Sequence, residues 1–194
     1  MPPAWIAPMP KWIAQQFAYV SGVAILWTLL YAINDYFFNF SLFNHTANLI
    51  FLPAMLRPLA VLLFGPAGVV GLFVGSLISF NLSPDLPLTM LPTSLASAAA
   101  GLIAITALRQ LPALAQQLTG ELTQIKLSTI ILLCTLTAAC NALSHQLIYA
   151  FTGAAATPPS QLLAMFIGDT LGSLLMLYAL AALLRLVRRA VEDK

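Results

Sequence analysis

Six long apolar segments, separated by short polar breaks, make up most of this chain. Only 7% of its 194 residues are charged and 60% are hydrophobic, whereas a soluble domain has about 25% charged residues. A helix crosses the hydrocarbon core of a bilayer with about 20 apolar residues. We therefore expect an all-α, polytopic membrane protein, with one transmembrane domain over residues 1–194 and the lipid bilayer around most of its surface. The six predicted spans are 12–33, 47–64, 66–80, 88–108, 127–151 and 161–184.

Positive charges are distributed unevenly among the predicted loops. Cytoplasmic loops of membrane proteins carry an excess of Lys and Arg. With six spans and a cytoplasmic N-terminus, the loops on the other side contain Asp35 and Asp85 but no Lys or Arg. Both termini are therefore predicted to be cytoplasmic. The seven positive residues on the cytoplasmic side are Lys11, Arg109, Lys126, Arg185, Arg188, Arg189 and Lys194.

Several functional classes do not fit this composition. A net charge of +2 is too small for a nucleic-acid binder. Cys134 and Cys140 are six residues apart on one predicted helix and face different ways, so they cannot form a disulfide with each other. The sequence has no nucleophile motif, no phosphate-binding glycine loop and no metal-ligand spacing. We expect neither an enzyme nor a cofactor, a metal site or a nucleic-acid partner.

Two opposite charges inside predicted spans form the first part of a candidate site. Ionisable groups are costly in a bilayer and commonly functional there. Arg57, in the second span, and Asp169, in the sixth, lie about 15 Å and about 12 Å deep at 1.5 Å of rise per residue. Their similar depth and opposite sign predict a direct contact or one bridging group. The pair is either a structural salt bridge or a ligand or proton site.

The fifth predicted span adds a polar face. A polar face cannot be turned toward lipid, so we expect these side chains to point inward and to line a pocket that opens toward the outside. His145 is alternatively a hydrogen-bonded structural histidine. The residues of this face, at spacings of three, four, three and one, are Cys134, Thr137, Asn141, Ser144 and His145.

Prolines and small residues predict local geometry. Pro53 and Pro58 flank Arg57 and predict a kink or local unwinding, because each removes a backbone N–H. Small residues at helical spacing let helices approach closely, either within one bundle or in a homodimer. Similar sequences at 74–78 and 171–175 leave open an inverted 3+3 repeat of the kind found in transporters. The small residues are Gly71 and Gly75, Gly168 and Gly172, and Ser94, Ser97 and Gly101.

Three of the spans resemble a known family. Phe-Leu-Pro-Ala at 51–54, followed by an apolar segment that contains two spaced glycines, and Phe-Ile-Gly-Asp-Thr-Leu-Gly at 166–172 are similar to the bacterial membrane-associated sensor domain of the first type (MASE family). The chain departs from the family pattern at 54–57, where Ala-Met-Leu-Arg replaces the usual small residue and glycine. The residues that match family positions are Pro53, Gly65, Gly75, Asp169 and Gly172.

The resemblance implies a sensor or scaffold module in the bacterial inner (cytoplasmic) membrane. Such a module, without its own output domain, would signal through a membrane or cytoplasmic partner. The alternative is the substrate-binding subunit of an energy-coupling-factor type small-molecule transporter. Those subunits resemble the arrangement predicted here in having six spans, cytoplasmic termini and an outward pocket. The small-xxx-small pair Ala14 and Ala18 is similar to the motif with which they dock their coupling subunit.

Overall fold

The computed structural model describes residues 10–43, 47–81, 89–118, 125–153 and 159–192. These residues are almost entirely helical, which confirms the all-α class. The elements in chain order are α1 (Lys11–Phe38), η2 (Asn39–Ser41), β1 (Leu42–Phe43), β2 (Ala47–Asn48), η3 (Leu52–Met55), α2 (Leu56–Phe64), α3 (Pro66–Asn81), α4 (Met90–Leu108), α5 (Pro112–Ala115), α6 (Leu127–Thr152) and α7 (Pro159–Glu192).

Four helical segments are long and apolar enough to cross a membrane. They are Lys11–Ser41, Met90–Leu108, Leu127–Thr152 and Pro159–Leu186. Two further apolar segments, Leu52–Phe64 and Pro66–Phe80, rise only about 20 Å and about 22 Å, at 1.5 Å per residue. The hydrocarbon core is about 30 Å thick. The six-span count and the 3+3 arrangement therefore remain predictions.

The segment predicted as a second span, 47–64, differs from a continuous helix. It begins as strand β2, which pairs with β1 in a short antiparallel hairpin, and becomes helical only at Leu52. Pro53 lies in the first turn of η3, and Pro58 lies in the first turn of α2. Proline is tolerated there because the first N–H groups of a helix have no partner within it. Both prolines thus lie where a helical element begins. This agrees with the predicted local unwinding and not with a bend inside one long helix.

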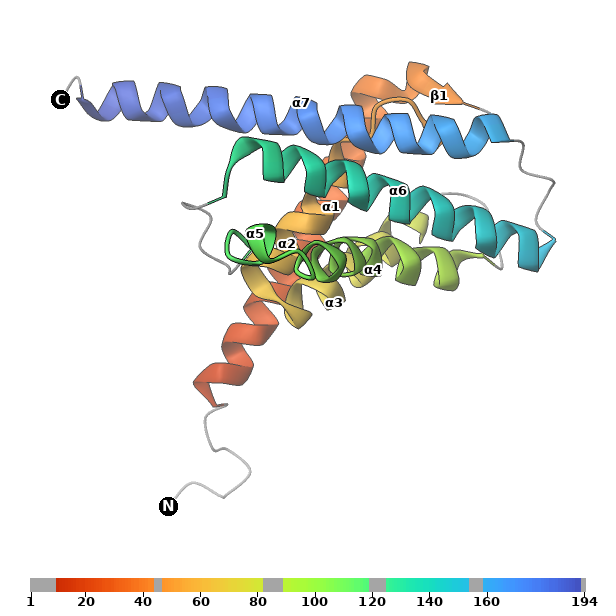
Figure 1. The fold of residues 1–194 in the computed structure, drawn as a ribbon, viewed down its shortest axis with the longest axis horizontal. Coiled ribbons are helices and arrows are strands. Elements are labelled where there is room, and N and C mark those ends of the chain that lie inside the picture. The colour runs from red at the N-terminus through yellow and green to blue at the C-terminus, as the bar shows by residue number, and fades with distance from the viewer. Residues whose placement is uncertain (1–9, 44–46, 82–88, 119–124, 154–158, 193–194) are drawn as a thin grey trace.

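The helices pack as a series of neighbours. α1 packs on α3, α3 on α4, α4 on α6 and α6 on α7, while η3 contacts both α7 and α1. Figure 1 shows α6 and α7 side by side, with α1 crossing the bundle obliquely. Gly65, with a φ of +56°, ends α2 and makes the tight turn into α3. The η3–α2 segment is thereby placed in contact with the long helices.

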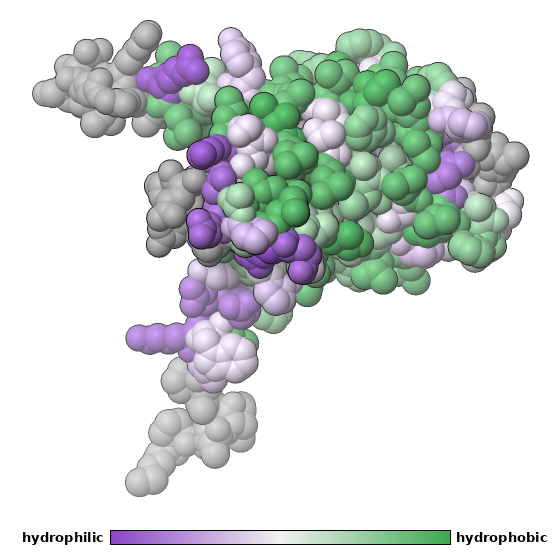
Figure 2. Space-filling view, in the orientation of Figure 1, coloured by the Kyte–Doolittle hydropathy of each residue, from purple (hydrophilic) through white to green (hydrophobic). Residues whose placement is uncertain are grey.

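The outer surface is largely apolar. Large hydrophobic side chains such as Leu102, Leu147 and Leu163 are about half exposed. Figure 2 shows hydrophobic residues over most of the visible face, with hydrophilic ones gathered mainly on the side where α1 and α6 begin and α7 ends. Apolar helices of spanning length with an apolar outer surface indicate a membrane protein.

Candidate functional site: a buried ion-pair network

A buried ion pair links α2 to α7. Arg57, in the first turn of α2, is 3% exposed, and Asp169, in the N-terminal third of α7, is 4% exposed. Nη1 of Arg57 lies 2.7 Å from Oδ2 of Asp169. The contact predicted from their matched depth is therefore confirmed. Whether the pair also serves a ligand or a proton remains a prediction.

Two hydrogen bonds extend the pair to the other long helices. Asn141, on α6, donates from Nδ2 to the same Asp169 oxygen at 2.7 Å. Arg57 donates from Nε to Oγ of Ser97, on α4, at 2.9 Å. Asn141 was a predicted site residue, whereas the sequence indicated Ser97 only as a small residue for helix packing. The network joins α2, α4, α6 and α7 through one guanidinium and one carboxylate.

Two aromatic rings lie close to the guanidinium. The Cζ of Arg57 lies 5.3 Å from the ring centroid of Trp27, on α1, and 5.4 Å from that of Phe51. Cations are attracted to aromatic faces within about 6 Å of the ring centroid, and more strongly when desolvated. Sequence reasoning missed both residues, because an aromatic residue in an apolar span does not reveal which charge it faces.

The backbone before α2 is held by side chains and carbonyls of other elements. The N–H of Phe51 donates to the carbonyl of Gly168 at 3.0 Å, and the N–H of Leu52 donates to Oδ1 of Asn34, on α1, at 2.8 Å. Non-helical backbone at membrane depth is tolerated where its polar groups are satisfied inside the protein. Asn34, 1% exposed, is therefore a structural residue of this site.

Gly168 and Gly172, on α7, make room for the irregular segment that precedes η3. A Cβ built on Gly168 would overlap the carbonyl of Asn48, and one on Gly172 would overlap the carbonyl of Phe51. The predicted packing role is therefore modified: these glycines admit the non-helical segment before η3 rather than a continuous helix. They bring the backbone of α7, and with it Asp169, up to the start of α2.

Gly71 and Gly75, on α3, pack against α1. A Cβ on Gly71 would lie 2.7 Å from the Cβ of Val23, and one on Gly75 would lie 2.8 Å from the Cβ of Trp27. Both glycine faces are thus covered within one chain. A homodimer of this protein would have to use another surface.

The remaining predicted site residues lie further along α6. His145 follows Asn141 by one turn, and its ring packs edge-on against Tyr149 at 6.0 Å between centroids. Both ring nitrogens are buried. Ser144 is half-buried and makes none of the hydrogen bonds described for the ion pair. Because Asn141 is 1% exposed, it lies in the packed interior, and the outward-opening pocket remains a prediction.

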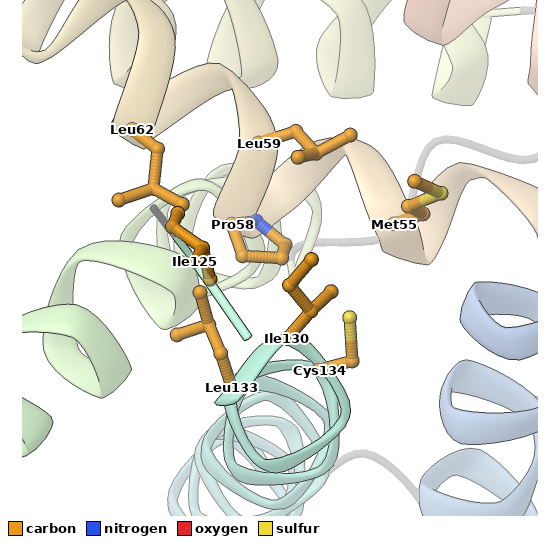
Figure 3. Close-up of a pocket in the computed structure, with 8 residues that line it drawn as sticks. All are labelled: Met55, Pro58, Leu59, Leu62, Ile125, Ile130, Leu133 and Cys134. Atoms are coloured by element: carbon orange, nitrogen blue, oxygen red, sulfur yellow. The ribbon is translucent and has the colours of Figure 1, made fainter. Parts of the chain in front are cut away.

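A small apolar cavity lies between α2 and the start of α6. It has a volume of about 20 Å³ and contains no polar lining atoms. Figure 3 shows its lining residues, among them Pro58 from α2 and Cys134 from α6. A cavity of this size holds about one water-sized sphere, and apolar cavities stay dry. It is therefore a packing defect beside the network and not a ligand pocket.

The described residues offer no arrangement for a metal ion. Within them, no group of three or more His, Cys, Asp or Glu side chains is placed to bind one. Cys134 and Cys140 are both free thiols. The chemistry available at the site is that of a carboxylate, a guanidinium, an amide and an imidazole whose polar atoms are buried.

Comparison with protein-family models, with curated proteins and with solved structures finds no match to this chain.

Proposed function

We propose that this protein is a sensor or scaffold module of the bacterial inner membrane that acts through a partner protein. The observation that carries the proposal is the network of Arg57, Asp169, Asn141 and Ser97, which joins four helices inside the bundle. Replacing a buried ion pair by well-packed apolar residues is often neutral or stabilising. A purely structural connection would therefore not need these charges.

The network is suited to conformational coupling. A ligand or a proton that competes for either charge would weaken the contact between α2 and α7. α7 continues for 23 residues beyond Asp169, to Glu192, which is about 35 Å of helix at 1.5 Å per residue. A shift of α7 at the ion pair would reach a partner on the side of the protein where α7 ends (Figure 1).

A transporter subunit is the second candidate function. Ala14 and Ala18 are both exposed on the first turns of α1, so the small-xxx-small face is free to contact another helix. In this case the partners would be a coupling subunit and an ATPase, and the network would form part of a solute site.

Site-specific photo-crosslinking in native membranes tests the proposal. A photoreactive residue at Leu111, which is 54% exposed between α4 and α5, samples the predicted cytoplasmic side. The matched control is Phe151, 88% exposed at the opposite end of the bundle. We expect adducts with a histidine kinase or a cyclic-dinucleotide enzyme from position 111 only. Adducts with a transport ATPase and its coupling subunit would favour the second candidate, and the absence of any partner adduct would contradict both.

A further inference from the structure

One face of α6 carries three polar side chains, one on each successive turn, with buried polar atoms that make no hydrogen bond of ordinary geometry in the described structure. These atoms are Oγ1 of Thr137, Oδ1 of Asn141 and the two ring nitrogens of His145, one of which lies near the backbone of Thr93 on α4. Thr137 and Asn141 are 2% and 1% exposed. Side chains four residues apart lie above one another on a helix, so the three form a row about 12 Å long. Asn141 connects this row to Asp169.

The hydroxyl of Thr137 differs from most other threonine hydroxyls in the helices, which donate to a carbonyl of their own helix. Thr135, on the same helix, donates to the carbonyl of Ile131 at 2.9 Å. Thr137 makes no such bond to its own helix. Its hydroxyl is therefore available to a group beside the helix. The threonines that donate to the carbonyl four residues earlier are Thr28, Thr93, Thr106, Thr135, Thr152 and Thr170.

Leaving this row dry would be costly. A buried polar group without a partner carries the full penalty of its lost hydration, and the row contains at least three such atoms. An amide oxygen accepts, a hydroxyl donates and accepts, and a neutral imidazole does one of each. The partner that suits this mixture is small, uncharged and able both to donate and to accept.

We propose that the row holds ordered water molecules, which bridge Thr137, Asn141 and His145 and give the Arg57–Asp169 pair contact with water. A buried water makes about three hydrogen bonds to otherwise unsatisfied polar groups, and the row offers such groups at each turn. The cavity at the Cys134 end of the same face is apolar and about 20 Å³ in volume, so it does not enlarge the row into a site for a bulkier solute. The proposal is independent of whether the protein is a sensor or a transporter subunit.

The first test compares two threonine-to-valine variants in the purified protein. Thr137→Val keeps the side-chain shape but removes the hydroxyl that would bind water. Thr135→Val, at a partly exposed position on the same helix, reports the cost of the exchange itself. We expect Thr137→Val to lower the Tm by several degrees more than Thr135→Val. An equal or higher Tm for Thr137→Val would mean that an unpartnered hydroxyl had been removed from a dry row, and would overturn the proposal.

The second test uses hydroxyl radicals generated from water by X-ray irradiation of the unmodified protein. Such radicals oxidise side chains that contact bound water. Met55 is 3% exposed and lines the apolar cavity, and methionine is intrinsically more reactive than histidine. We expect His145 to be oxidised several-fold faster than Met55 despite this. Oxidation of His145 more slowly than Met55 would overturn the proposal, as would a high-resolution density map with a larger molecule or no ordered water along the row.

Discussion

The Arg57 guanidinium is paired with one carboxylate, and both side chains are almost fully buried. A lone charge that remains after one partner is removed costs about 3–5 kcal/mol. We expect Arg57→Met and Asp169→Leu each to destabilise the protein by about this amount, and the double variant to lose less than the sum. Denaturant unfolding in detergent measures the three free energies. Arg185→Met, at an exposed position on α7, serves as the control and should change the stability by less than about 0.5 kcal/mol. Additive losses would show that the two charges are not coupled.

Ser97 has a role that its size alone does not reveal. Its hydroxyl accepts a charge-assisted hydrogen bond from Arg57, and bonds to charged groups contribute about 1.5–3 kcal/mol. We expect Ser97→Ala to lower the free energy of unfolding by about this amount. The matched control is Ser79→Ala, because the equally buried Ser79 donates only to the carbonyl of Gly75 in its own helix. A loss no larger than that of the control would remove Ser97 from the network.

At the scale of elements, close approach of α7 to the segment before η3 is what brings Asp169 to Arg57. A Cβ at Gly172 would overlap the backbone carbonyl of Phe51, and backbone cannot rotate away as a side chain can. We expect Gly172→Ala to cost about 1–3 kcal/mol through overpacking. On α1, a Cβ added at Gly22 would have nothing within 4 Å, so Gly22→Ala should be neutral or stabilising by up to about 1 kcal/mol. Equal thermal stability of the two variants would contradict the close approach.

The sequence predicted the long helices better than the segment that builds the site. Apolar length alone identifies α1, α4, α6 and α7, because a segment surrounded by lipid must satisfy its backbone hydrogen bonds internally, as a helix does. It did not reveal that residues 48–51 are not helical, since the N–H groups of Phe51 and Leu52 bond to Gly168 and Asn34, which are distant in sequence. Charge sign and depth were enough to predict the Arg57–Asp169 contact. The rings of Trp27 and Phe51 were not predictable, because their position depends on the crossing of α1 with the irregular segment.

At the scale of the whole molecule, the α2–α3 hairpin does not affect the predicted sides of the termini. A hairpin begins and ends on the same side whether or not it crosses completely, so four spans and six spans both place the N- and C-termini together. Fusion of an enzyme active only in the cytoplasm after Lys194 should therefore give activity. A fusion at Asp85, in the predicted outer loop, is the control and should be inactive. The opposite pattern would reverse the orientation derived from the Lys and Arg distribution.

The tip of the hairpin decides between four and six spans. Leu62, next to the tip, lines the small cavity together with Ile125, which precedes the first residue of α6 by two positions. The hairpin thus reaches the level at which α6 begins, on the predicted cytoplasmic side, although α2 alone is too short to cross. Leu63 is 47% exposed, so a cysteine placed there, in a background that lacks Cys134 and Cys140, reports the surroundings of the tip to a thiol reagent. We expect an impermeant reagent to label Leu63→Cys in inside-out vesicles and not in right-side-out ones, because the non-helical segment before η3 and η3 itself complete the crossing. Labelling in neither orientation, with labelling restored by detergent, would place the tip inside the bilayer and reduce the protein to four spans.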